Sequence, residues 1–359
     1  MAFPYSTDLH TALLAVQRAS LATVLVHRRS AGPTSLSKSD TTPVTVADFA
    51  AQSLLVSALR GAFPSDAFLG EEDAGALRSD AALAARVWAV VRETLTAYLD
   101  VNPAGAAALK APASVDEMLE SIDVAGRGEG GGKGRVWVMD PVDGTMTYVL
   151  GKQWVVALAL LEGGIQRVAV LGCPNLALDG DMTVREDAVD AEGMGYIISA
   201  VKGHGAGMWR MSKEGAFPAD VPRKENDPGT AAVEINLVYS TLSTHSSGDK
   251  TRSLATKLGS PWPGWDIYAT QMRYIACALG SCGAAVRIPR KGGDFGNMYD
   301  HAGGVLLCEE VGVKVTDLEG KPFDWTAGRT LSNNWGHVAA PMYCHDTVLA
   351  KLAEVLDEE

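Results

Sequence analysis

The first part of the chain has the hydrophobic pattern of two helices. Between residues 8 and 29, Leu9, Leu13 and Val16 recur three or four positions apart, which is the spacing of one face of an amphipathic helix. A polar, turn-rich stretch follows. A second helix is then predicted over residues 46–59.

Short apolar runs after these helices predict strands. The runs at 67–69 and 136–139 each end at acidic residues beside a glycine, so each predicted strand delivers carboxylates at its C-terminal end. The runs at 154–161 and 166–171 are separated by a Glu-Gly-Gly turn, which is typical of a hairpin. The Ala-rich stretch at 80–124 is predicted to be helical in part. This part of the chain is therefore predicted to be α+β with an antiparallel sheet.

The pattern changes after a polar stretch with three prolines at residues 215–230, which is the best candidate for a linker. Beyond it, strands are predicted at 233–238, 284–288 and 313–315. Helices are predicted between them, at 249–257, 269–279 and after Asp300. Such alternation is typical of an α/β unit. We therefore predict an α+β domain over residues 1–228 and a smaller α/β domain over 229–359.

Length and charge narrow the classes of partner. A chain of 359 residues is long enough for two domains, and 47% apolar with 21% charged residues is ordinary for a globular protein. The formal net charge is −12 and no Lys/Arg-rich cluster stands out, so a nucleic-acid polymer is not an expected partner. A small anion can still bind if a metal ion inverts the local charge.

The cysteines and the N-terminus bear on location. The five cysteines form no CxxC pair and have no zinc spacing, so we expect reduced thiols and a cytoplasmic protein. The N-terminus lacks a basic segment followed by an apolar one, which predicts no secretory signal. No uninterrupted run of about 18 apolar residues is present, so no membrane span is expected.

Two acidic turns carry most of the chemical information. The segment DPVDGT at residues 140–145 places Asp140 and Asp143 three positions apart, and its proline and glycine allow a bend that brings the carboxylates together. The segment GEED at residues 70–73 adds Glu71 and Glu72. Mg²⁺ usually binds one or two carboxylates together with a substrate phosphate. These turns favour a metal-assisted phosphoryl hydrolase; the alternative is a pair of acidic surface turns.

Two further segments place acidic residues next to helices. In SDTTPVTVAD at residues 39–48, Asp40 lies in a loop before the second predicted helix. In DFGNMYDHAGG at residues 294–304, Asp300 lies at the start of an apolar helix. Each segment has a simpler interpretation as a helix cap. The glycine-rich stretch at 126–134 does not match a P-loop, and the sequence contains no G-x-S-x-G or H-E-x-x-H motif.

In order and in wording, the four acidic segments together resemble the lithium-sensitive, Mg²⁺-dependent phosphatase superfamily of inositol monophosphatase, inositol polyphosphate 1-phosphatase and 3'(2'),5'-bisphosphate nucleotidase. The resemblance extends over nearly the whole chain, from SDTTPVTVAD to TLSNNWGHVAAP. The EGG run at 129–131 followed by GRVWVMD at 134–140 is similar to the nucleotidase branch specifically. The resemblance implies a layered αβαβα sugar-phosphatase-like fold with the active site between two domains.

The resemblance also implies roles for individual residues. The metal ligands would be Glu71, Asp140, Asp143, Asp300 and the carbonyl of Val142, with Glu72 supporting them. Asp40 and Thr145 would hold and deprotonate the attacking water. Backbone N–H groups of Gly144 and Thr145 would hold phosphate oxygens, and Arg273 would supply a cation on the substrate side. The implied cofactor is Mg²⁺, in two or three copies that clamp the phosphate for in-line attack.

The segment after the metal turn departs from the nucleotidase pattern. That pattern continues with Lys-Gly-Phe and then an Arg-Gly pair, whereas this chain has Met146-Thr147-Tyr148 and then Leu150-Gly151. Two cations expected near a doubly phosphorylated substrate are therefore missing. Tyr299 also replaces a tryptophan that is common before the last metal ligand, while Arg273 stands where a lysine is usual.

These observations lead to one preferred function and two alternatives. The preferred function is a phosphomonoesterase acting on 3'-phosphoadenosine 5'-phosphate or a related nucleotide. The first alternative is an inositol phosphate or other small-metabolite phosphatase with a diverged pocket. The second is a catalytically dead family member that binds an anion or a partner, against which the complete carboxylate set argues, because unused acids would repel one another. The expected state is a monomer or small homo-oligomer whose partner is a small phosphorylated metabolite, with no membrane.

Overall fold

The computed structural model describes residues 4–29, 35–37, 43–130, 132–178, 182–191, 193–211, 235–291 and 295–358. Three of the sequence-based predictions lie outside these residues: the placement of Asp40, the linker at 215–230 and the domain boundary between 228 and 229. The predicted strand at 233–238 lies partly outside them.

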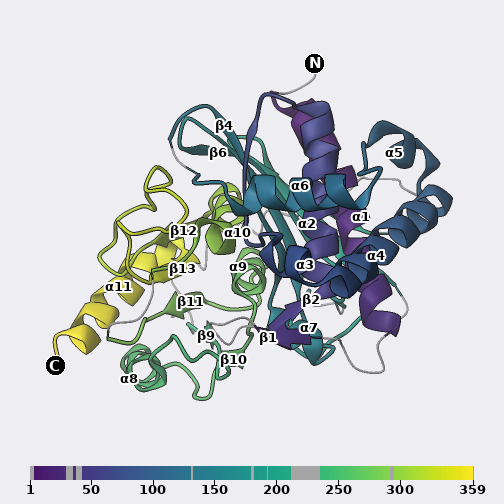
Figure 1. Cartoon of the computed structure of the whole chain (residues 1–359). Coiled ribbons are helices and arrows are strands. Elements are labelled where there is room, and N and C mark those ends of the chain that lie inside the picture. The colour runs from purple at the N-terminus through teal and green to yellow at the C-terminus, as the bar shows by residue number, and fades with distance from the viewer. Residues whose placement is uncertain are drawn as a thin grey trace.

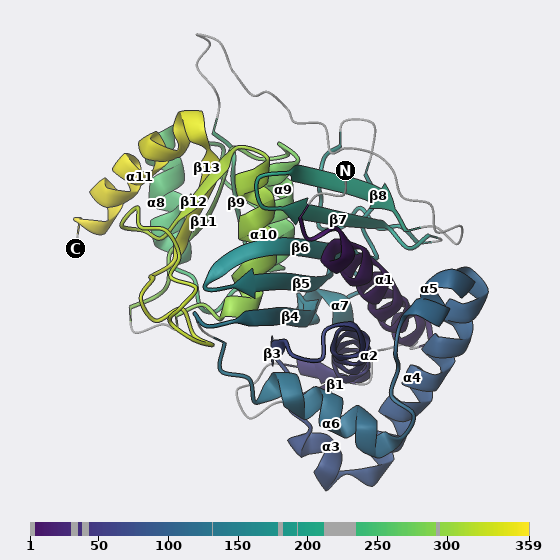
Figure 2. The ribbon, with the colours of Figure 1, turned by 90° about the horizontal axis from the view of Figure 1, so that it is seen from above.

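The described elements stack in five alternating layers, which Figure 2 shows edge-on. Helices α8 (Gly248–Leu258) and α11 (Met342–Leu356) form one outer layer over a five-stranded sheet. Helices α9 (Thr270–Ala278) and α10 (Met298–Glu310) form the middle layer. A six-stranded sheet follows, and α1 (Ser6–Arg29) and α2 (Val46–Ala62) cover its far face. This arrangement is the layered αβαβα fold that the sequence predicted.

The six-stranded sheet has the order β3-β4-β5-β6-β7-β8. Its strands are β3 (Ala67–Gly70), β4 (Arg135–Asp143), β5 (Val155–Glu162), β6 (Ile165–Cys173), β7 (Tyr196–Val201) and β8 (Gly205–Arg210). Strand β3 runs parallel to β4, and the remaining neighbours are antiparallel. The predicted hairpin is confirmed, because β5 and β6 pair directly across Gly163 and Gly164.

The five-stranded sheet has the order β10-β9-β11-β13-β12. Its strands are β9 (Leu237–Tyr239), β10 (Trp265–Asp266), β11 (Ala284–Arg287), β12 (Val313–Thr316) and β13 (His337–Pro341). Strand β9 is parallel to β10 and β11, whereas β13 is antiparallel to β11 and β12. The predicted alternation of strands and helices in this part of the chain is therefore confirmed. The final unit of β13 and α11 was not predicted.

The remaining elements lie outside the two main sheets. They are the short ribbon of β1 (Ser35–Ser37) and β2 (Pro43–Thr45), and the helices α3 (Gly75–Ser79), α4 (Ala81–Val101), α5 (Pro103–Ala108), α6 (Val115–Gly126) and α7 (Thr145–Val149). Helices α4 to α6 confirm that residues 80–124 are largely helical. Figure 1 shows them on the side of the molecule opposite α11.

Among the described helices, α1 alone is long and apolar enough to be compared with a membrane span. A window of 18 residues in it has a mean hydropathy of 1.4, which is sufficient by length and composition for a membrane span. However, 72% of that window is buried inside the fold, where α1 packs against α2 and β6. Core helices meet the same criterion, and the apolar residues of α1 belong to the core.

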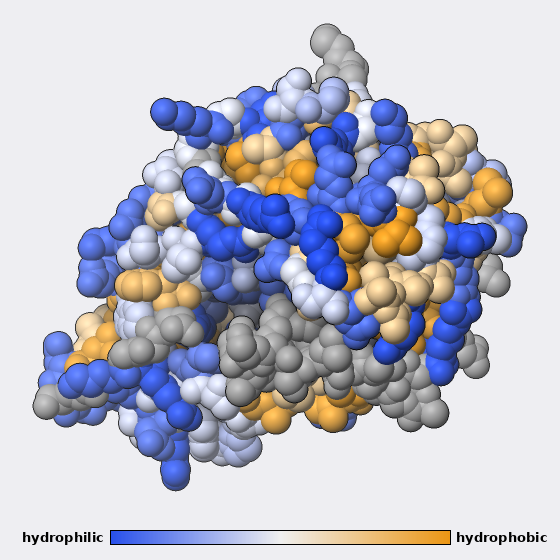
Figure 3. All heavy atoms as spheres, viewed as in Figure 1, coloured by the Kyte–Doolittle hydropathy of each residue, from blue (hydrophilic) through white to orange (hydrophobic). Residues whose placement is uncertain are grey.

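On the face drawn in Figure 3, hydrophilic residues separate the apolar ones into small patches.

The alternation of side chains along β4 determines what each face of the large sheet contacts. Trp137 and Met139 belong to the core cluster under α1 and α2. Val136 and Val138 belong to the cluster shared with α9 and α10. Because side chains alternate along a strand, the residue after Met139 faces the middle layer. That residue is Asp140.

Candidate active site

A β-bulge near the end of β4 places Asp140 and Asp143 on the same face of the sheet. Asp140 pairs with Ala157 and Asp143 with Val155, so two residues of β4 oppose only Val156. Without the extra residue, side chains three positions apart would point to opposite faces. The prediction of a turn at this point is corrected: the strand continues to Asp143 and the bulge supplies the bend.

Gly144 lies between the end of β4 at Asp143 and the start of α7 at Thr145, as the N-cap of the helix. Its φ of +91° lies in the left-handed region, which favours glycine. A Cβ at this position would lie 2.8 Å from the Cβ of Ala269. The conformation turns the chain sharply, so that Thr145 becomes the first residue of α7.

The carboxylate of Asp143 is held by the N-terminus of α9. The backbone N–H groups of Thr270 and Gln271 donate to its two oxygens at 3.1 and 2.6 Å. Free N–H groups and the helix dipole both favour a negative charge at this end of a helix. The predicted metal turn is therefore fixed by a helix that lies 127 residues further along the chain.

Asp140 and Val142 are fixed within the bulge itself. Oδ1 of Asp140 accepts a hydrogen bond from the backbone N–H of Val142 at 3.1 Å. The carbonyl oxygen of Val142 accepts one from Oγ1 of Thr145 at 3.2 Å. All three residues are buried, so the turn is rigid and its oxygens have defined directions.

Glu71 lies beside Asp140 because β3 and β4 are parallel neighbours. Gly70, the last residue of β3, pairs with Met139, so the next residue on each strand is an acid. The adjoining Glu72 is 4% exposed, and its backbone N–H donates to Oε1 of Gln52 at 3.0 Å. Nη1 of Arg329 donates to the carbonyl oxygen of Gly70 at 2.8 Å. These contacts fix the end of β3.

Asp300 enters the site from the first turn of α10. The helix begins at Met298 and Asn297 is its N-cap. Oδ2 of Asp300 accepts a hydrogen bond from the backbone N–H of Asn297 at 3.2 Å. The simpler interpretation of Asp300 as the N-cap residue is therefore wrong, because Asn297 is the N-cap and Asp300 is the third residue of the helix. Its carboxylate nevertheless accepts the N–H of the N-cap residue.

Burial and mutual repulsion raise the pKa values of the three aspartates. Burial, followed by Glu71, Asp143 and Asp300, raises the pKa of Asp140 well above its ordinary value. Burial and then Asp300 raise the pKa of Asp143 to about 7, against the opposing hydrogen bonds from α9. Burial and then Glu71 raise the pKa of Asp300 to about 6. The fold therefore brings four acidic groups close enough to act on one another.

These groups have the chemistry of a Mg²⁺ site. Carboxylates and a backbone carbonyl are hard oxygen ligands, which Mg²⁺ prefers, and a cation would relieve the repulsion among the acids. Among the described residues, no three His, Cys, Asp or Glu side chains are close enough to hold a metal ion by themselves. Mg²⁺ commonly binds through one or two carboxylates and completes its shell with water and phosphate, so pairs of these acids are sufficient ligands.

Arg273 lies one turn into α9 and is buried. Its Nη2 donates to Oγ1 of Thr270 at 2.8 Å. Within the described part of the chain its Nε has no hydrogen-bond partner. Burial lowers the pKa of Arg273, and the charge of Asp143 opposes that change. The predicted cation is thus near enough to Asp143 for the two charges to interact, and its Nε is unused among the described residues.

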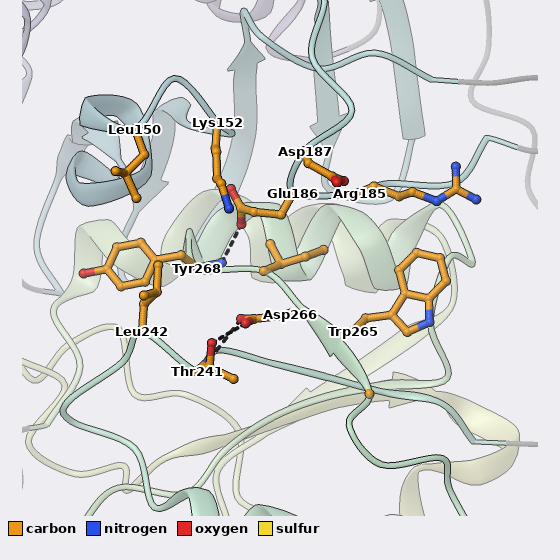
Figure 4. A pocket seen from close by; sticks show the side chains of 12 residues that line it. Leu150, Lys152, Arg185, Glu186, Asp187, Thr241, Leu242, Trp265, Asp266 and Tyr268 are labelled. Atoms are coloured by element: carbon orange, nitrogen blue, oxygen red, sulfur yellow. Dashed lines mark hydrogen bonds between the residues drawn. The ribbon is translucent and has the colours of Figure 1, made fainter. Parts of the chain in front are cut away.

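Met146 and Leu150, the two positions at which the sequence differs from the nucleotidase pattern by lacking a cation, lie on α7 and directly after it. Met146 is half-buried within α7, and Leu150 directly follows the helix with its side chain 55% exposed. Leu150 lines a pocket of about 550 Å³, drawn in Figure 4. Leu150, where the nucleotidase pattern has a cation, therefore contributes an apolar side chain to the wall of this pocket.

Three residues that connect these segments were not predicted from the sequence. The backbone N–H groups of Thr270 and Gln271 donate to the carboxylate of Asp143. The guanidinium of Arg329 donates to the backbone carbonyl of Gly70. A signal was available for the first two, because they begin a predicted helix and helix N-termini bind carboxylates. No local pattern indicated that Arg329 would contact the end of β3.

Comparisons with known proteins place this chain among proteins of similar sequence and fold. The model of the inositol monophosphatase family matches residues 100–356. A 3'(2'),5'-bisphosphate nucleotidase of Emericella nidulans is 35% identical over 356 residues, covering 98% of this chain and 99% of the relative. The enzyme of the same name from Schizosaccharomyces pombe is 34% identical and that from Oryza sativa 31%, each covering 99% of this chain, and 97% and 96% of the relative respectively.

Solved structures with the same fold are more distant in sequence. An inositol monophosphatase from Thermotoga maritima superposes with a TM-score of 0.60 at 18% identity, covering 98% of this chain and 99% of that one. A second neighbour, the Staphylococcus aureus inositol monophosphatase II with bound 2'AMP, has a TM-score of 0.52 at 14% identity, covering 96% of both chains.

Proposed function

We propose that this chain, which belongs to the inositol monophosphatase family, is a Mg²⁺-dependent phosphomonoesterase that removes the 3'(2')-phosphate of 3'-phosphoadenosine 5'-phosphate or a related nucleotide. The observation that carries the proposal is the bulge in β4, which directs Asp140 and Asp143 toward Asp300 between the two sheets. Support for a nucleotide comes from relatives named 3'(2'),5'-bisphosphate nucleotidase that are 31–35% identical over nearly the full chain.

The proposed metal ligands are the carboxylates of Glu71, Asp140, Asp143 and Asp300 with the carbonyl of Val142. When bound, two or three Mg²⁺ ions supply charge neutralisation at the phosphate and a lowered pKa of the attacking water. The protein orients these ligands: α9 fixes Asp143 through two N–H groups, and the bulge fixes Asp140. Glu72, buried beside Glu71, supports that strand end.

Thr145 is proposed to position the attacking water. Its hydroxyl donates to the Val142 carbonyl, so its oxygen lone pairs remain free to accept a hydrogen bond from water. With Thr145 holding the water, the carboxylate of Asp40 would accept its proton; this role rests on sequence resemblance alone. Backbone N–H groups of Gly144 and Thr145 would hold phosphate oxygens, as turn N–H groups do elsewhere, and Arg273 would add a positive charge behind them.

A second candidate function is hydrolysis of inositol phosphates. Solved neighbours of this fold include a protein with bound inositol monophosphate as well as one with bound 2'AMP. Leu150, in place of a cation, favours a substrate with fewer negative charges on that side. The third candidate, a catalytically inactive anion-binding protein, is disfavoured by the crowding of acids that raises the pKa values of Asp140, Asp143 and Asp300.

One assay separates these candidates. Phosphate release is measured with Mg²⁺ from 3'-phosphoadenosine 5'-phosphate, inositol 1-phosphate and fructose 1,6-bisphosphate, each with and without Li⁺. We expect the nucleotide to have the highest kcat/KM and Li⁺ to inhibit. A preference for inositol 1-phosphate would replace the nucleotidase proposal with the second candidate. No release from any of the three would favour the inactive binding protein.

We also propose a reducing, cytoplasmic environment. The five cysteines are all buried and unpaired as disulfides. Sγ of Cys277 and Sγ of Cys282 lie 3.1 Å apart as thiols. Detection of the tagged protein in a cytosolic fraction tests this location, and enrichment in a secreted fraction contradicts it.

A further inference from the structure

Arg329 joins the half of the molecule that contains the six-stranded sheet to the half that contains the five-stranded sheet. It lies between β12 and β13 of the second half and is half-buried. Its guanidinium reaches across to the end of β3 in the first half. Arg329 is neither a proposed metal ligand nor a proposed substrate contact, so the site described above leaves this side chain without a role.

The backbone of Arg329 is attached to the start of α10. Its carbonyl oxygen accepts the N–H of Met298, the first residue of that helix, at 2.8 Å. Two residues further on, the N–H of Leu331 donates to the carbonyl oxygen of Gly296 at 2.9 Å. Asp300 lies two residues after Met298. The backbone of Arg329 is therefore fixed to the helical turn that carries Asp300.

The guanidinium of Arg329 is attached to the segment that carries Glu71. Its Nη1 donates to the carbonyl oxygen of Gly70 at 2.8 Å, and its Nη2 donates to the carbonyl oxygen of Gly126. Gly70 ends β3 directly before Glu71, and Gly126 is the last residue of α6, where a helix leaves its carbonyl groups unpaired. A planar guanidinium presents its donors in fixed directions, so it holds both carbonyls in one arrangement.

The end of α6 and the segment after β3 are packed tightly together. Helix α6 runs beside β3 (Figure 2), and a Cβ at Gly126 would lie 2.1 Å from the carbonyl oxygen of Glu72. From within the first half, Gln52 donates to that carbonyl at 2.5 Å and accepts the Glu72 N–H at 3.0 Å. Arg329 thus adds a second attachment of this segment, and that attachment comes from the other half.

Arg329 also contacts the residue directly before Asp300. Its guanidinium carbon lies 5.8 Å from the centre of the Tyr299 ring, which is within the range of a cation–π interaction. The same guanidinium therefore contacts the immediate neighbours of Glu71 and of Asp300. Among the neighbouring charges, that of Glu71 does most to raise the pKa of Asp300. The separation of these two acids thus bears directly on a cation that binds near both.

We propose that Arg329 is a positioning residue of the metal site, which sets the separation of Glu71 and Asp300 across the two halves of the molecule. The inference rests on the proposed function, because it treats both acids as Mg²⁺ ligands. Arg329 acts through the backbone that it holds and touches neither metal nor substrate. Its own backbone contacts with α10 do not depend on the side chain, so a substitution releases the link to β3 and α6 and the ring contact with Tyr299.

The test compares Arg329→Gln and Arg329→Lys with Arg18→Lys. Arg18 is a matched control because it is buried and its Nη2 also donates to two carbonyl oxygens, of Leu54 at 2.9 Å and Lys110 at 2.8 Å, neither of which adjoins a proposed ligand. Binding of Mg²⁺ is measured by calorimetry without substrate. Arg329→Gln should raise the Kd for Mg²⁺ about tenfold, as loss of groups that orient metal ligands does elsewhere. Arg329→Lys should raise it less, because lysine keeps the charge but lacks the planar fork.

Kinetics and melting separate positioning from general stability. In Arg329→Gln, the Mg²⁺ concentration for half-maximal phosphate release should rise with the Kd. The value of kcat at saturating Mg²⁺ should change less than about twofold, because excess metal restores occupancy of the site. Arg18→Lys should lower the melting temperature in EDTA and leave the Kd for Mg²⁺ unchanged.

The outcomes distinguish this inference from the proposed function. An unchanged Kd for Mg²⁺ in both Arg329 variants would overturn the positioning role, while hydrolysis by the unmodified protein would keep the proposed function. An equal rise of the Kd in Arg18→Lys would also overturn the positioning role, because it would trace the effect to general stability. Weaker Mg²⁺ binding in the Arg329 variants of a protein that hydrolyses no phosphate ester would overturn the proposed function and retain the positioning role.

Discussion

The backbone N–H of Gln271 donates to Oδ2 of Asp143 at 2.6 Å, and the same residue's side chain connects this contact to α10. Its Nε2 donates to the carbonyl oxygen of Tyr299 at 3.0 Å, and its Oε1 accepts the N–H of Gly304 at 2.7 Å. Gln271 is fully buried. It therefore fixes the distance between β4, which carries Asp143, and the helix that carries Asp300.

Replacing this side chain should loosen the metal site. We expect Gln271→Ala to raise the Mg²⁺ concentration for half-maximal activity by about tenfold or more, as loss of residues that orient metal ligands does elsewhere. It also leaves the Tyr299 carbonyl and the Gly304 N–H without their side-chain partner in the core. Titration of activity with Mg²⁺ measures the first effect, and thermal unfolding measures the second.

Gln166→Ala is the matched control for this variant. Gln166 is also buried, and its Nε2 donates to the carbonyl oxygen of Ala302 on the same helix, but it lies on β6 rather than on α9, which holds Asp143. It should lower the unfolding temperature with a smaller effect on Mg²⁺ dependence. Equal changes in Mg²⁺ dependence in both variants would show that Gln271 acts only through general stability.

Removing one charge at the bulge should strongly reduce turnover. Asp143→Asn keeps the shape of the side chain but weakens a metal ligand, so we expect kcat/KM with Mg²⁺ to fall at least about 100-fold. Asp123→Asn is the control, because Asp123 is a carboxylate that pairs with Arg78 and Arg127 and accepts the Ala74 N–H, and it is not one of the proposed metal ligands. That variant should lose stability and retain turnover. Activity near wild type in Asp143→Asn would refute its role as a ligand.

Mg²⁺ should stabilise the protein more at high pH than at low pH. The folded-state pKa of Asp143 is raised to about 7, above the unfolded value of about 3.9. Its contribution to the stability of the metal-free protein is thus present below about pH 4 and lost as pH rises to about 7. A bound cation favours the ionised form and offsets this loss. Melting temperatures with EDTA and with Mg²⁺, compared at about pH 5 and about pH 8, on either side of that folded-state pKa, measure the difference. A Mg²⁺-induced shift that is the same at both pH values would contradict it.

Gly144 should tolerate substitution less than another glycine of similar backbone conformation. An alanine Cβ there would meet Ala269 at 2.8 Å and Thr147 Oγ1 at 2.9 Å, at a φ of +91°. Gly163 in the β5–β6 hairpin has a φ of +59°, and a Cβ added there would have no atom within 4 Å. Gly163→Ala should cost about 1–2 kcal/mol from the backbone alone.

The crowded site should add to that cost and also change function. We expect Gly144→Ala to lower the unfolding temperature more than Gly163→Ala does and to reduce kcat, because Thr145 and Asp143 flank the substituted residue. Denaturant unfolding and steady-state kinetics on both variants test this. Equal stability losses with unchanged kcat would mean that the close approach to Ala269 is easily relieved.

Much of the secondary structure followed from local pattern. The helical period of residues 8–29 and the Gly-Gly turn between β5 and β6 each reflect interactions between residues close in sequence. The turn expected at residues 140–145 was a strand with a bulge, because pairing with β5 decides whether a Pro-containing segment remains extended. Strand β13 and helix α11, near the end of the chain, were not predicted.

The acids themselves could be recognised from the sequence, since carboxylates beside glycine and proline indicate oxygen ligands at turns, and the order of four such segments indicated the family. That they share one site was implied only by the family resemblance, and the contacts that bring them together could not be read from the sequence. Glu71, Asp140, Asp143 and Asp300 meet because β3 lies parallel to β4, a bulge turns Asp143 to the face of Asp140, and α9 and α10 lie between the two sheets. These are long-range contacts, which no local pattern encodes. The same holds for Leu150, whose type is visible in the sequence but whose place in a pocket with Tyr268 and Leu242 was decided only by the packing of one half of the chain against the other.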